Sequence, residues 1–435
     1  MASANTFLGG AAGRLLAPSI VFRFFAAALL FHLLGWLVLL LAAPSLPDFA
    51  GGLGPALAAL HLFTLGVLLM TAIGASLQLL PVATRQSVTA ARWPYELIWG
   101  LYTLGVLVAT SGMGAELPAP LGWGALALAA ALLLYLFLLA RNLRGARGMR
   151  LVVLHGWGAG LSLLLLLGSG LSLAGAYSGF FLLERIAAVG VHITFAGYGF
   201  MGLLVMGFSY ILVPMFALSD NPAPAWSHLS LGLALAALLL ALAVWLGWLP
   251  AWLLGGALAA LGLAWLMHVA LMERSLRSGM RRGLGSSFVL VRIGWGCLIA
   301  SLALALLSEF GWPIRRAPVL FGLLLVGGLL TLLLGMLSRI VPFLAAMHAG
   351  AGMRRPPTPS HMTAQRALDV HLYSHCAAFL ALLGGVCLDS VWLLRGGAAV
   401  GALGAAAYLV FFGKAWRRMT QTLSKKDALE RSKPA

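Results

Sequence analysis

The sequence predicts an all-α, polytopic membrane protein with about twelve transmembrane helices. Hydrophobic residues make up 62% of the 435 positions and charged residues only 9%, so the charge density of a water-facing surface is missing. Apolar stretches of roughly 20 residues, the length that crosses a bilayer, recur along the whole chain. These stretches are predicted to be helices because an open sheet cannot satisfy its backbone groups in lipid.

Each span is placed by the centre of one apolar stretch. The centres, in order, lie near Leu30, Leu68, Val106, Leu132, Leu164, Leu203, Leu238, Leu258, Leu302, Leu325, Leu383 and Ala406. We expect residues 1–419 to form a single transmembrane domain and the polar residues 420–435 to form a disordered cytoplasmic tail. The start of the chain lacks the charged region and cleavage site of a secretory signal, so we expect span one to be retained.

Positive charge is concentrated in alternate connectors. The formal net charge is +17, but the basic residues do not form a face with interleaved aromatic residues, so nucleic acid is not an expected partner. The clusters follow spans two, four, eight, ten and twelve: Arg85 and Arg92; Arg141, Arg144, Arg147 and Arg150; Arg274, Arg277, Arg281 and Arg282; Arg354, Arg355 and Arg366; Lys414, Arg417, Arg418, Lys425 and Lys426. We expect these connectors and both termini to be cytoplasmic, in a bacterial-type cytoplasmic (inner) membrane whose lipid bilayer surrounds the chain.

Three short segments share one pattern, a glycine followed after six residues by a proline. They are "GASLQLLPV" from Gly74, "GFSYILVPM" from Gly207 and "GMLSRIVPF" from Gly335, separated by 133 (207 − 74) and 128 (335 − 207) positions. Each closes the second span of a set of four. We therefore predict three pseudo-symmetric four-helix sets, over about 18–145, 146–275 and 285–414. The alternative is that glycine followed by proline is common at the ends of membrane helices.

Two histidines lie at matched depth in the second spans of sets one and two. His61 and His192 are about seven to nine residues into their spans, or roughly 10 to 14 Å deep, and each is followed in His-x4-Gly spacing by Gly66 or Gly197. Small residues beside a ligand histidine let a flat macrocycle approach the helix. The pair is predicted to bind a metal centre, with His32 in span one as a further candidate. The alternative is that these histidines only hydrogen-bond across helices.

A second candidate metal site lies in "DVHLYSHC". His371 and His375 are spaced i, i+4 on one helical face, and Asp369 and Cys376 add possible ligands for copper or zinc. The alternative is a polar helix start. Snorkelling or hydration is expected to explain the remaining histidines, which are His155, His268 and His348 at span ends and His228 and His361 in or near connectors. The three cysteines lack CxxC or CxxCH spacing, so neither a disulfide nor a c-type haem is expected.

Three arginines, Arg185, Arg315 and Arg316, lie at outer helix mouths, where a cytoplasmic topology role does not explain them. Arginine suits carboxylates through paired donors, and haem propionates are carboxylates. Contact with lipid headgroups is the alternative, and Glu184 could neutralise Arg185 as a surface pair.

These residues resemble subunit I of the haem-copper oxidases. The likeness rests on twelve spans in three four-helix sets, an inside N-terminus, and a histidine in the outer half of span two followed by a glycine and "LLP". In that family span two supplies a low-spin haem ligand and span six a copper ligand, positions matched here by His61 and His192. Arginines at the outer surface hold the propionates, a role that Arg315 and Arg316 could imitate from a different connector.

The sequence also departs from that family. Span seven has only His228 at its mouth, where the family carries a histidine pair, and span ten lacks the His-x-His that ligates both haems. A complete dioxygen-reducing haem-copper centre is therefore not expected, and proton pumping is not expected with it. The chain is also similar in general character to the NnrS-like membrane proteins, twelve-span haem and copper binders linked to nitric oxide metabolism, although His61 is followed by Leu62 and not by their glutamate.

The leading prediction is a haem-b membrane protein that transfers electrons or handles a gas such as nitric oxide or dioxygen. His61 and His192 are expected either as the two axial ligands of the haem or as one haem ligand and one copper ligand. Copper is a possible second metal, and a cytochrome or another subunit of a respiratory complex is the expected redox partner. The alternatives are a metal-free secondary transporter, with Gln78, Tyr210 and Arg339 along its pathway, and an accessory or metal-insertion subunit of a respiratory complex. An oxidoreductase is possible, but the sequence assigns no catalytic residue. No connector is long enough for a soluble catalytic domain, so any chemistry is expected in the membrane.

Overall fold

The computed structural model describes residues 14–87, 91–181, 183–281, 283–351, 353 and 355–431. Over these residues the chain is helical, without a strand. Twelve helices, some of them broken by a π-helical segment, are long and apolar enough to cross a membrane. The predicted all-α membrane class and its twelve spans are thereby confirmed.

The elements follow the order expected for three sets of four spans. Set one contains α2 (Pro18–Ala42), a composite second span of α3 (Pro55–His61), η2 (Leu62–Leu69) and α4 (Met70–Thr84), then α5 (Trp93–Gly114) and α6 (Pro118–Arg144). Set two contains α7 (Arg150–Tyr177), a composite second span of α8 (Arg185–Thr194), η3 (Phe195–Gly202) and α9 (Leu203–Ala217), then α10 (Pro224–Trp245) and α11 (Leu253–Ser278). Set three contains α12 (Ser286–Glu309), α13 (Ala317–Gly350), the short α14 (Pro359–Met362), α15 (Gln365–Cys387) and α16 (Val391–Arg431).

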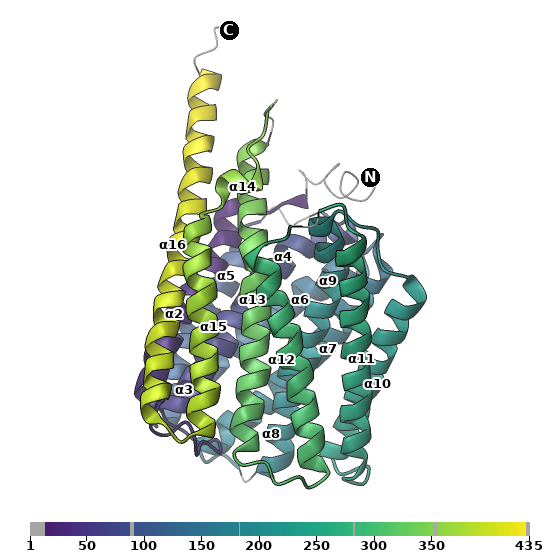
Figure 1. Cartoon of the computed structure of the whole chain (residues 1–435), viewed down its shortest axis with the longest axis vertical. Helices are drawn as coiled ribbons and strands as arrows, with labels where there is room; N and C mark the ends of the chain where they lie inside the picture. The colour runs from purple at the N-terminus through teal and green to yellow at the C-terminus, as the bar shows by residue number, and fades with distance from the viewer. Residues whose placement is uncertain are drawn as a thin grey trace.

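Alternating spans give the bundle two ends. One end, here called the arginine-rich end, carries the start of α2, the end of α16 and the connectors with the basic clusters. The other, here called the opposite end, carries α3 and α8, as Figure 1 shows at the bottom of the view. Two of the basic residues, Arg282 and Arg354, lie outside the described residues.

The second span is the most buried of the four in every set. The second spans meet in the middle of the bundle, where α13 contacts both η2 and η3. The third and fourth spans pair tightly as α5 with α6, α10 with α11, and α15 with α16. Their outer faces expose large apolar side chains, including Leu104, Phe137, Leu239, Leu263 and Leu403. Such a belt suits contact with lipid.

The glycine that opens each repeated segment lets the second span pack closely on the first span of its own set. A Cβ added there would collide with a neighbour, since real Cβ atoms do not come within 3.0 Å of another heavy atom. The neighbours are Phe24 Cβ for Gly74 (2.7 Å), His155 Cβ for Gly207 (2.7 Å), and the Ser287 carbonyl oxygen (2.6 Å) and Leu290 Cβ (3.0 Å) for Gly335. This shared contact supports the predicted repeat.

A second glycine makes the same kind of contact about two turns nearer the opposite end. The contacts are Gly66 with Phe31 (2.7 Å), Gly199 with Ser162 (2.8 Å) and Gly328 with Cys297 (2.8 Å). The partners keep one spacing of seven residues, from Phe24 to Phe31, His155 to Ser162 and Leu290 to Cys297. The structural counterpart of Gly66 is therefore Gly199. The pairing of Gly66 with Gly197 by His-x4-Gly spacing is wrong by two residues.

The two glycines are eight residues apart in sets one and two (74 − 66 and 207 − 199) but seven apart in set three (335 − 328). The extra residue lies in a π-helix, η2 in set one and η3 in set two, whereas α13 is continuous. A π-helix closes its hydrogen bonds at i→i+5, so it holds one residue more than an α-helical turn between the same contacts. The π-helix therefore keeps both glycines in register with a first span of unchanged spacing.

The expected disordered tail is not observed over most of its length. Helix α16 continues from the last span to Arg431, as the projecting end in Figure 1 shows. The stretch from Thr420 is thus helical as far as Arg431, and residues 432–435 lie outside the described residues. Hydroxyls of Thr420 and Thr422 hydrogen-bond carbonyls of the preceding turn, and the basic residues continue the helix without a breaking residue.

Candidate functional site

His61 and His192 come together at the opposite end of the bundle. Their ring centroids are 6.3 Å apart and the ring planes are tilted by 36°. Both side chains are partly exposed, whereas most of the bundle's other histidines are buried. The two residues that the sequence singled out from different sets thus form a pair.

The π-helices place this pair. His61 is the last residue of α3 and directly precedes η2, and His192 lies three positions before η3 begins. η2 and η3 are equivalent, since Leu62–Leu69 and Phe195–Gly202 are separated by 133 positions (195 − 62). By that spacing His61 corresponds to Thr194, so the two histidines are not symmetry equivalents. π-helical turns occur frequently at functional sites.

The hydrogen-bond network assigns a tautomer to each ring. His61 Nδ1 donates to the Leu57 carbonyl oxygen at 3.0 Å. Ser169 gives its own hydroxyl hydrogen to the Leu165 carbonyl oxygen at 2.9 Å, so at 3.4 Å it accepts from His192 Nδ1. Each neutral ring therefore keeps its lone pair on Nε2, and none of the described residues hydrogen-bonds either Nε2. A neutral imidazole that donates one ring N–H to a protein acceptor and keeps the other nitrogen's lone pair free can bind a metal through that lone pair.

The ring separation agrees with two ligands of one metal ion. Imidazole nitrogens bind metals at about 2.0–2.1 Å, and the ring centroid lies about 1 Å behind the nitrogen, so two rings on opposite sides of one ion have centroids about 6 Å apart. The observed separation is 6.3 Å. The donor chemistry and the spacing of this pair are thus compatible with both imidazoles binding one metal ion.

The space beside Gly66 and Gly197, where the sequence predicts that a macrocycle could approach, is filled by packed side chains. The place of a Cβ at Gly66 is 2.7 Å from Phe31 Cβ, and that at Gly197 is 2.9 Å from a Leu325 methyl group. A macrocycle on either glycine would have to displace these side chains. The glycine that does adjoin a ring is Gly170 of α7, where a Cβ would lie 3.3 Å from His192 Cε1.

Arg185 is the one of the three outer arginines without an acidic partner among the described residues. Its guanidinium donates to the Tyr177 hydroxyl at 3.2 Å and lies 5.9 Å from the centroid of that ring. Glu184 does not neutralise it, because the Glu184 carboxylate caps α8 by accepting from the Ala187 amide at 2.7 Å. Seven residues separate Arg185 from His192, so both lie on nearly one face of α8 about 10 Å apart.

The connector ahead of α3 also reaches Arg185. A Cβ at Gly51 would lie 2.9 Å from the arginine's Nη2 atom. Arg185, at the start of the helix that carries His192, therefore contacts the connector that leads into the helix carrying His61. It also lines one end of a largely apolar cavity of about 570 Å³ between α8, α10, α11 and α12, together with Trp245 and Glu309.

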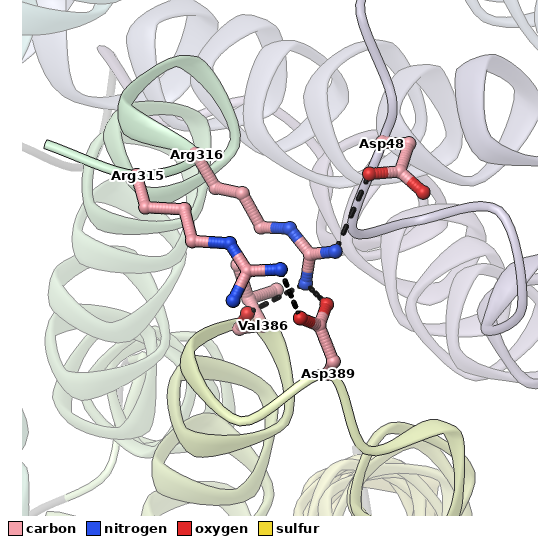
Figure 2. Close-up of polar contacts among 5 residues, drawn as sticks. All are labelled: Asp48, Arg315, Arg316, Val386 and Asp389. Carbon is pink, nitrogen blue, oxygen red and sulfur yellow. Dashed lines mark hydrogen bonds and ion pairs between the residues drawn. The ribbon is translucent and has the colours of Figure 1, made fainter.

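Arg315 and Arg316 are committed to a structural ion cluster (Figure 2). Both guanidinium groups pair with Asp389, and Arg316 also pairs with Asp48 at 3.3 Å. Arg316 further donates to the Val386 carbonyl oxygen at 2.9 Å, and only 14% of its side chain is exposed. The cluster joins three connectors of the opposite end. Arg316 is largely enclosed by this cross-link, whereas Arg315 pairs with Asp389 but keeps 73% of its side chain exposed, so its predicted contact with a propionate or a lipid headgroup stays a prediction.

His32 does not join His61 and His192. Its ring lies 6.1 Å from that of His371 and 6.5 Å from that of His375, with all three side chains buried. The cluster forms because α2 packs against α16, and α16 against α15. Asp369 accepts instead from Gln365 at 2.7 Å and is partly exposed, so it is not a member of the cluster.

The expectation that His155 and His268 are hydrated at span ends is wrong, because both are buried inside set two. Their rings lie on either side of Tyr210, with centroids at 5.6 and 5.2 Å from its own. In the described residues the Tyr210 hydroxyl, His155 Nε2 and both His268 nitrogens have no hydrogen-bond partner. The prediction failed because it used only the position of each histidine along its span, whereas burial also depends on which helices pack beside it. His228 and His361 are exposed, as expected.

Gln78, Tyr210 and Arg339, the residues predicted to line a transport pathway, form no hydrogen bond with one another in the described part of the chain. Gln78 is fully buried, and neither polar atom of its amide has a partner in the described residues. Arg339 donates to the Ser287 hydroxyl at 2.7 Å and to the Leu284 carbonyl oxygen, which ties α13 to the start of α12. No three His, Cys, Asp or Glu residues among those described are grouped closely enough to hold a metal ion by themselves.

No family model matches this chain, and no curated protein matches it in sequence.

Proposed function

We propose that the protein binds one haem b through His61 and His192 and carries electrons within the membrane. The observation that supports this proposal is the pair of imidazoles, which come from different sets and have ring centroids 6.3 Å apart. Each ring donates its Nδ1–H to a protein acceptor, so each Nε2 lone pair is free to bind a metal. Two lone pairs cannot hydrogen-bond each other, so the space near them suits a shared cation. A haem iron satisfies both at once.

The chain's own residues have separable tasks in this proposal. The Leu57 carbonyl oxygen and the Ser169 hydroxyl hold the two rings in their tautomers. Arg185, with no acidic partner among the described residues, offers paired donors to a carboxylate such as a haem propionate. When bound, the haem supplies a one-electron redox couple whose potential depends on its axial ligands and burial.

If His61 and His192 both held the haem, no position would remain open for nitric oxide or dioxygen, so the group would supply electron transfer and not gas binding. An electron carrier of this kind needs a redox partner at the end where its haem lies. We place that end outside and the arginine-rich end in the cytoplasm, following the positive-inside rule. The partner is then a cytochrome or a subunit of a respiratory complex that docks at the opposite end.

A distant relation to subunit I of the haem-copper oxidases is part of the proposal. It is supported by the twelve spans in three sets and by second spans at the centre of the bundle. The dinuclear centre of that family is not proposed here. The described part of α10 has only His228, which is exposed and bonds the Pro224 carbonyl oxygen at 2.7 Å, and α13 has only His348 at its arginine-rich end.

The test is an optical spectrum of the detergent-purified protein, oxidised and then reduced with dithionite, beside His61→Ala and His192→Ala. We expect b-type Soret and alpha bands in the parent protein and altered or missing bands in both variants. Nitric oxide should leave the parent spectrum unchanged, because neither axial position is free, and should change that of either variant which retains haem. His228→Ala is the matched control, since His228 is exposed, and it should leave the bands unchanged.

A colourless protein, after growth with an adequate haem supply, would contradict the haem proposal. A metal analysis of the same sample then separates a copper-only pair from a metal-free transporter. Bands that persist unaltered in both histidine variants would show that haem is bound elsewhere.

A further inference from the structure

A second group of histidines lies where α2, α15 and α16 pack together, separate from the pair of His61 and His192. His32 of α2 and His371 and His375 of α15 are 0%, 1% and 3% exposed. The ring centroids of His371 and His375 are 5.3 Å apart, and that of His32 is 6.1 and 6.5 Å from theirs. Three imidazoles so deep in an apolar core need a reason, because polar groups there are costly unless they are satisfied.

His371 offers a lone pair. Its Nδ1 bonds the Gly404 carbonyl oxygen of α16 at 3.0 Å, so Nδ1 carries the hydrogen. In the neutral ring Nε2 is then an acceptor, and this buried atom has no partner among the described residues.

His375 also offers a lone pair. The Thr331 hydroxyl of α13 gives its hydrogen to the Gly327 carbonyl oxygen at 2.6 Å, so at 2.8 Å it accepts from His375 Nε2. The neutral ring therefore has its lone pair on Nδ1. No hydrogen bond to this Nδ1 occurs within the described part of the chain.

His32 differs from the other two histidines because it offers an N–H donor and not a lone pair. The Trp36 indole can only donate, and at 3.0 Å its Nε1–H points to His32 Nε2. The neutral ring must then carry its hydrogen on Nδ1, an atom that is buried and without an acceptor among the described residues. The cluster thus presents two lone pairs and one N–H.

We propose that His371 Nε2 and His375 Nδ1 bind a copper ion whose third ligand is a water or hydroxide held by the Nδ1–H of His32. Two imidazoles at a tetrahedral angle on one ion have centroids about 5 Å apart, since metal–nitrogen bonds are about 2.0–2.1 Å. The 5.3 Å between His371 and His375 agrees with this value. The longer distances of His32 agree with contact through the bound solvent.

The donor set selects the metal class. The cluster supplies neutral imidazoles and no carboxylate or thiolate, which excludes the oxygen-seeking calcium and magnesium ions. Among divalent ions, copper binds nitrogen ligands most strongly. A hydroxide ligand would also offset part of the ion's charge in this apolar surrounding, and the N–H of His32 is placed to hold it.

The test starts from the double variant His61→Ala/His192→Ala, so its result does not depend on the proposed haem. In this background we expect one Cu(II) per chain after incubation with CuSO4 and gel filtration, with nitrogen couplings from two histidines in its paramagnetic resonance spectrum. Adding His371→Asn or His375→Asn should lower copper to below about one fifth. Adding His268→Asn, which replaces an equally buried histidine of set two, should leave one copper bound.

A second variant gives an effect of opposite sign, which a folding defect would not produce. In Trp36→Phe the indole N–H is gone, so His32 can move its hydrogen to Nε2 and offer Nδ1 as a third nitrogen ligand. We expect several-fold tighter copper binding and couplings from three histidines. Equal copper content with and without His371 and His375, or no copper binding in the parent background, would overturn the proposal and leave a site for water alone.

Discussion

The second spans of sets two and three differ by one residue between their two glycine contacts, and the span with the extra residue carries the histidine that we propose as a ligand. In set two, η3 interrupts the helix between the glycine contacts, and His192 lies just beyond it. In set three, α13 runs unbroken from Ala317 to Gly350, and no histidine stands at the matching depth. Set one resembles set two in this respect, because η2 begins directly after His61.

The comparison teaches that one span can hold an extra residue without losing its packing against the first span. The segment on the arginine-rich side of the π-helix is fixed by its glycine against the first span. In an α-helix one inserted residue would rotate the segment beyond it by about 100°. The π-helix takes up that residue in a wider turn, so the second glycine keeps its contact and the histidine segment beyond it keeps its orientation.

The largest effect is expected from changing the number of residues between each histidine and the glycines that pack on the first span. Deleting Thr64 from η2, or Ala196 from η3, leaves the two glycines of that span eight residues apart but brings the histidine one residue nearer to them. Both side chains are partly exposed, so little packing is lost directly. The histidine would turn away by about 100°, and haem content should fall to below about one tenth while far-ultraviolet circular dichroism stays unchanged.

A substitution is the matched control for that deletion. Thr64→Ala removes the same side chain but keeps the number of residues between His61 and Gly66. Haem content should then stay at or above half of the parent value. Loss of haem in Thr64→Ala would show that the Thr64 side chain, and not the residue count, is required.

An intermediate effect is expected at the glycines that all three sets share. Gly207→Ala and Gly335→Ala each place a Cβ within 2.7 Å of a neighbour, the latter against backbone at Ser287. Overpacking of this kind costs about 1–3 kcal/mol, which exceeds the gain of about 1 kcal/mol in helix propensity. The free energy of unfolding, measured by denaturation in mixed micelles, should fall by that net amount. Gly335→Ala should be the more harmful, because backbone cannot give way.

The control glycine is Gly168 of α7, where a Cβ would meet nothing within 4 Å. Gly168→Ala should leave the free energy of unfolding unchanged or raise it slightly. An equal loss at Gly168 and Gly207 would mean that close packing does not explain the repeated glycines.

The smallest effect is expected at the arginines, where structure and ligand binding should separate. Arg316→Ala removes two ion pairs and the donor to the Val386 carbonyl oxygen, and should lower the free energy of unfolding by about 1 kcal/mol without loss of haem. Arg315→Ala, at a side chain that is 73% exposed, should cost at most about 1 kcal/mol. Arg185→Gln should instead weaken haem retention with little change in stability. Haem loss in Arg316→Ala at unchanged stability would reverse this assignment.

Much of the fold could be predicted from the sequence, because hydropathy is a local signal. Apolar runs gave the number of spans, and the spacing of Gly74, Gly207 and Gly335 gave the sets. The π-helices were not predicted, because one inserted residue leaves hydropathy unchanged. A signal was nevertheless present, since Gly66 and Gly74 are eight residues apart whereas Gly328 and Gly335 are seven apart.

The candidate site was predicted in part. His61 and His192 were paired by depth, a quantity that the sequence carries, whereas the grouping of His32 with His371 depends on α2 lying beside α16 and on α16 pairing with α15. The ion pair of Arg316 with Asp48 spans 268 positions. Contacts between residues so far apart in sequence depend on how the helices pack around one another, and no local sequence pattern predicts them.

The most direct test of the central proposal is electron paramagnetic resonance of the oxidised, purified protein beside His61→Gly and His192→Gly, with and without added imidazole. If both residues are axial ligands of one haem, the parent protein gives a low-spin signal and each variant a high-spin one. Imidazole should enter the space left by the side chain and restore the low-spin signal in both. A low-spin signal that survives in either variant without imidazole, or a parent protein without any haem signal, would contradict the proposed site.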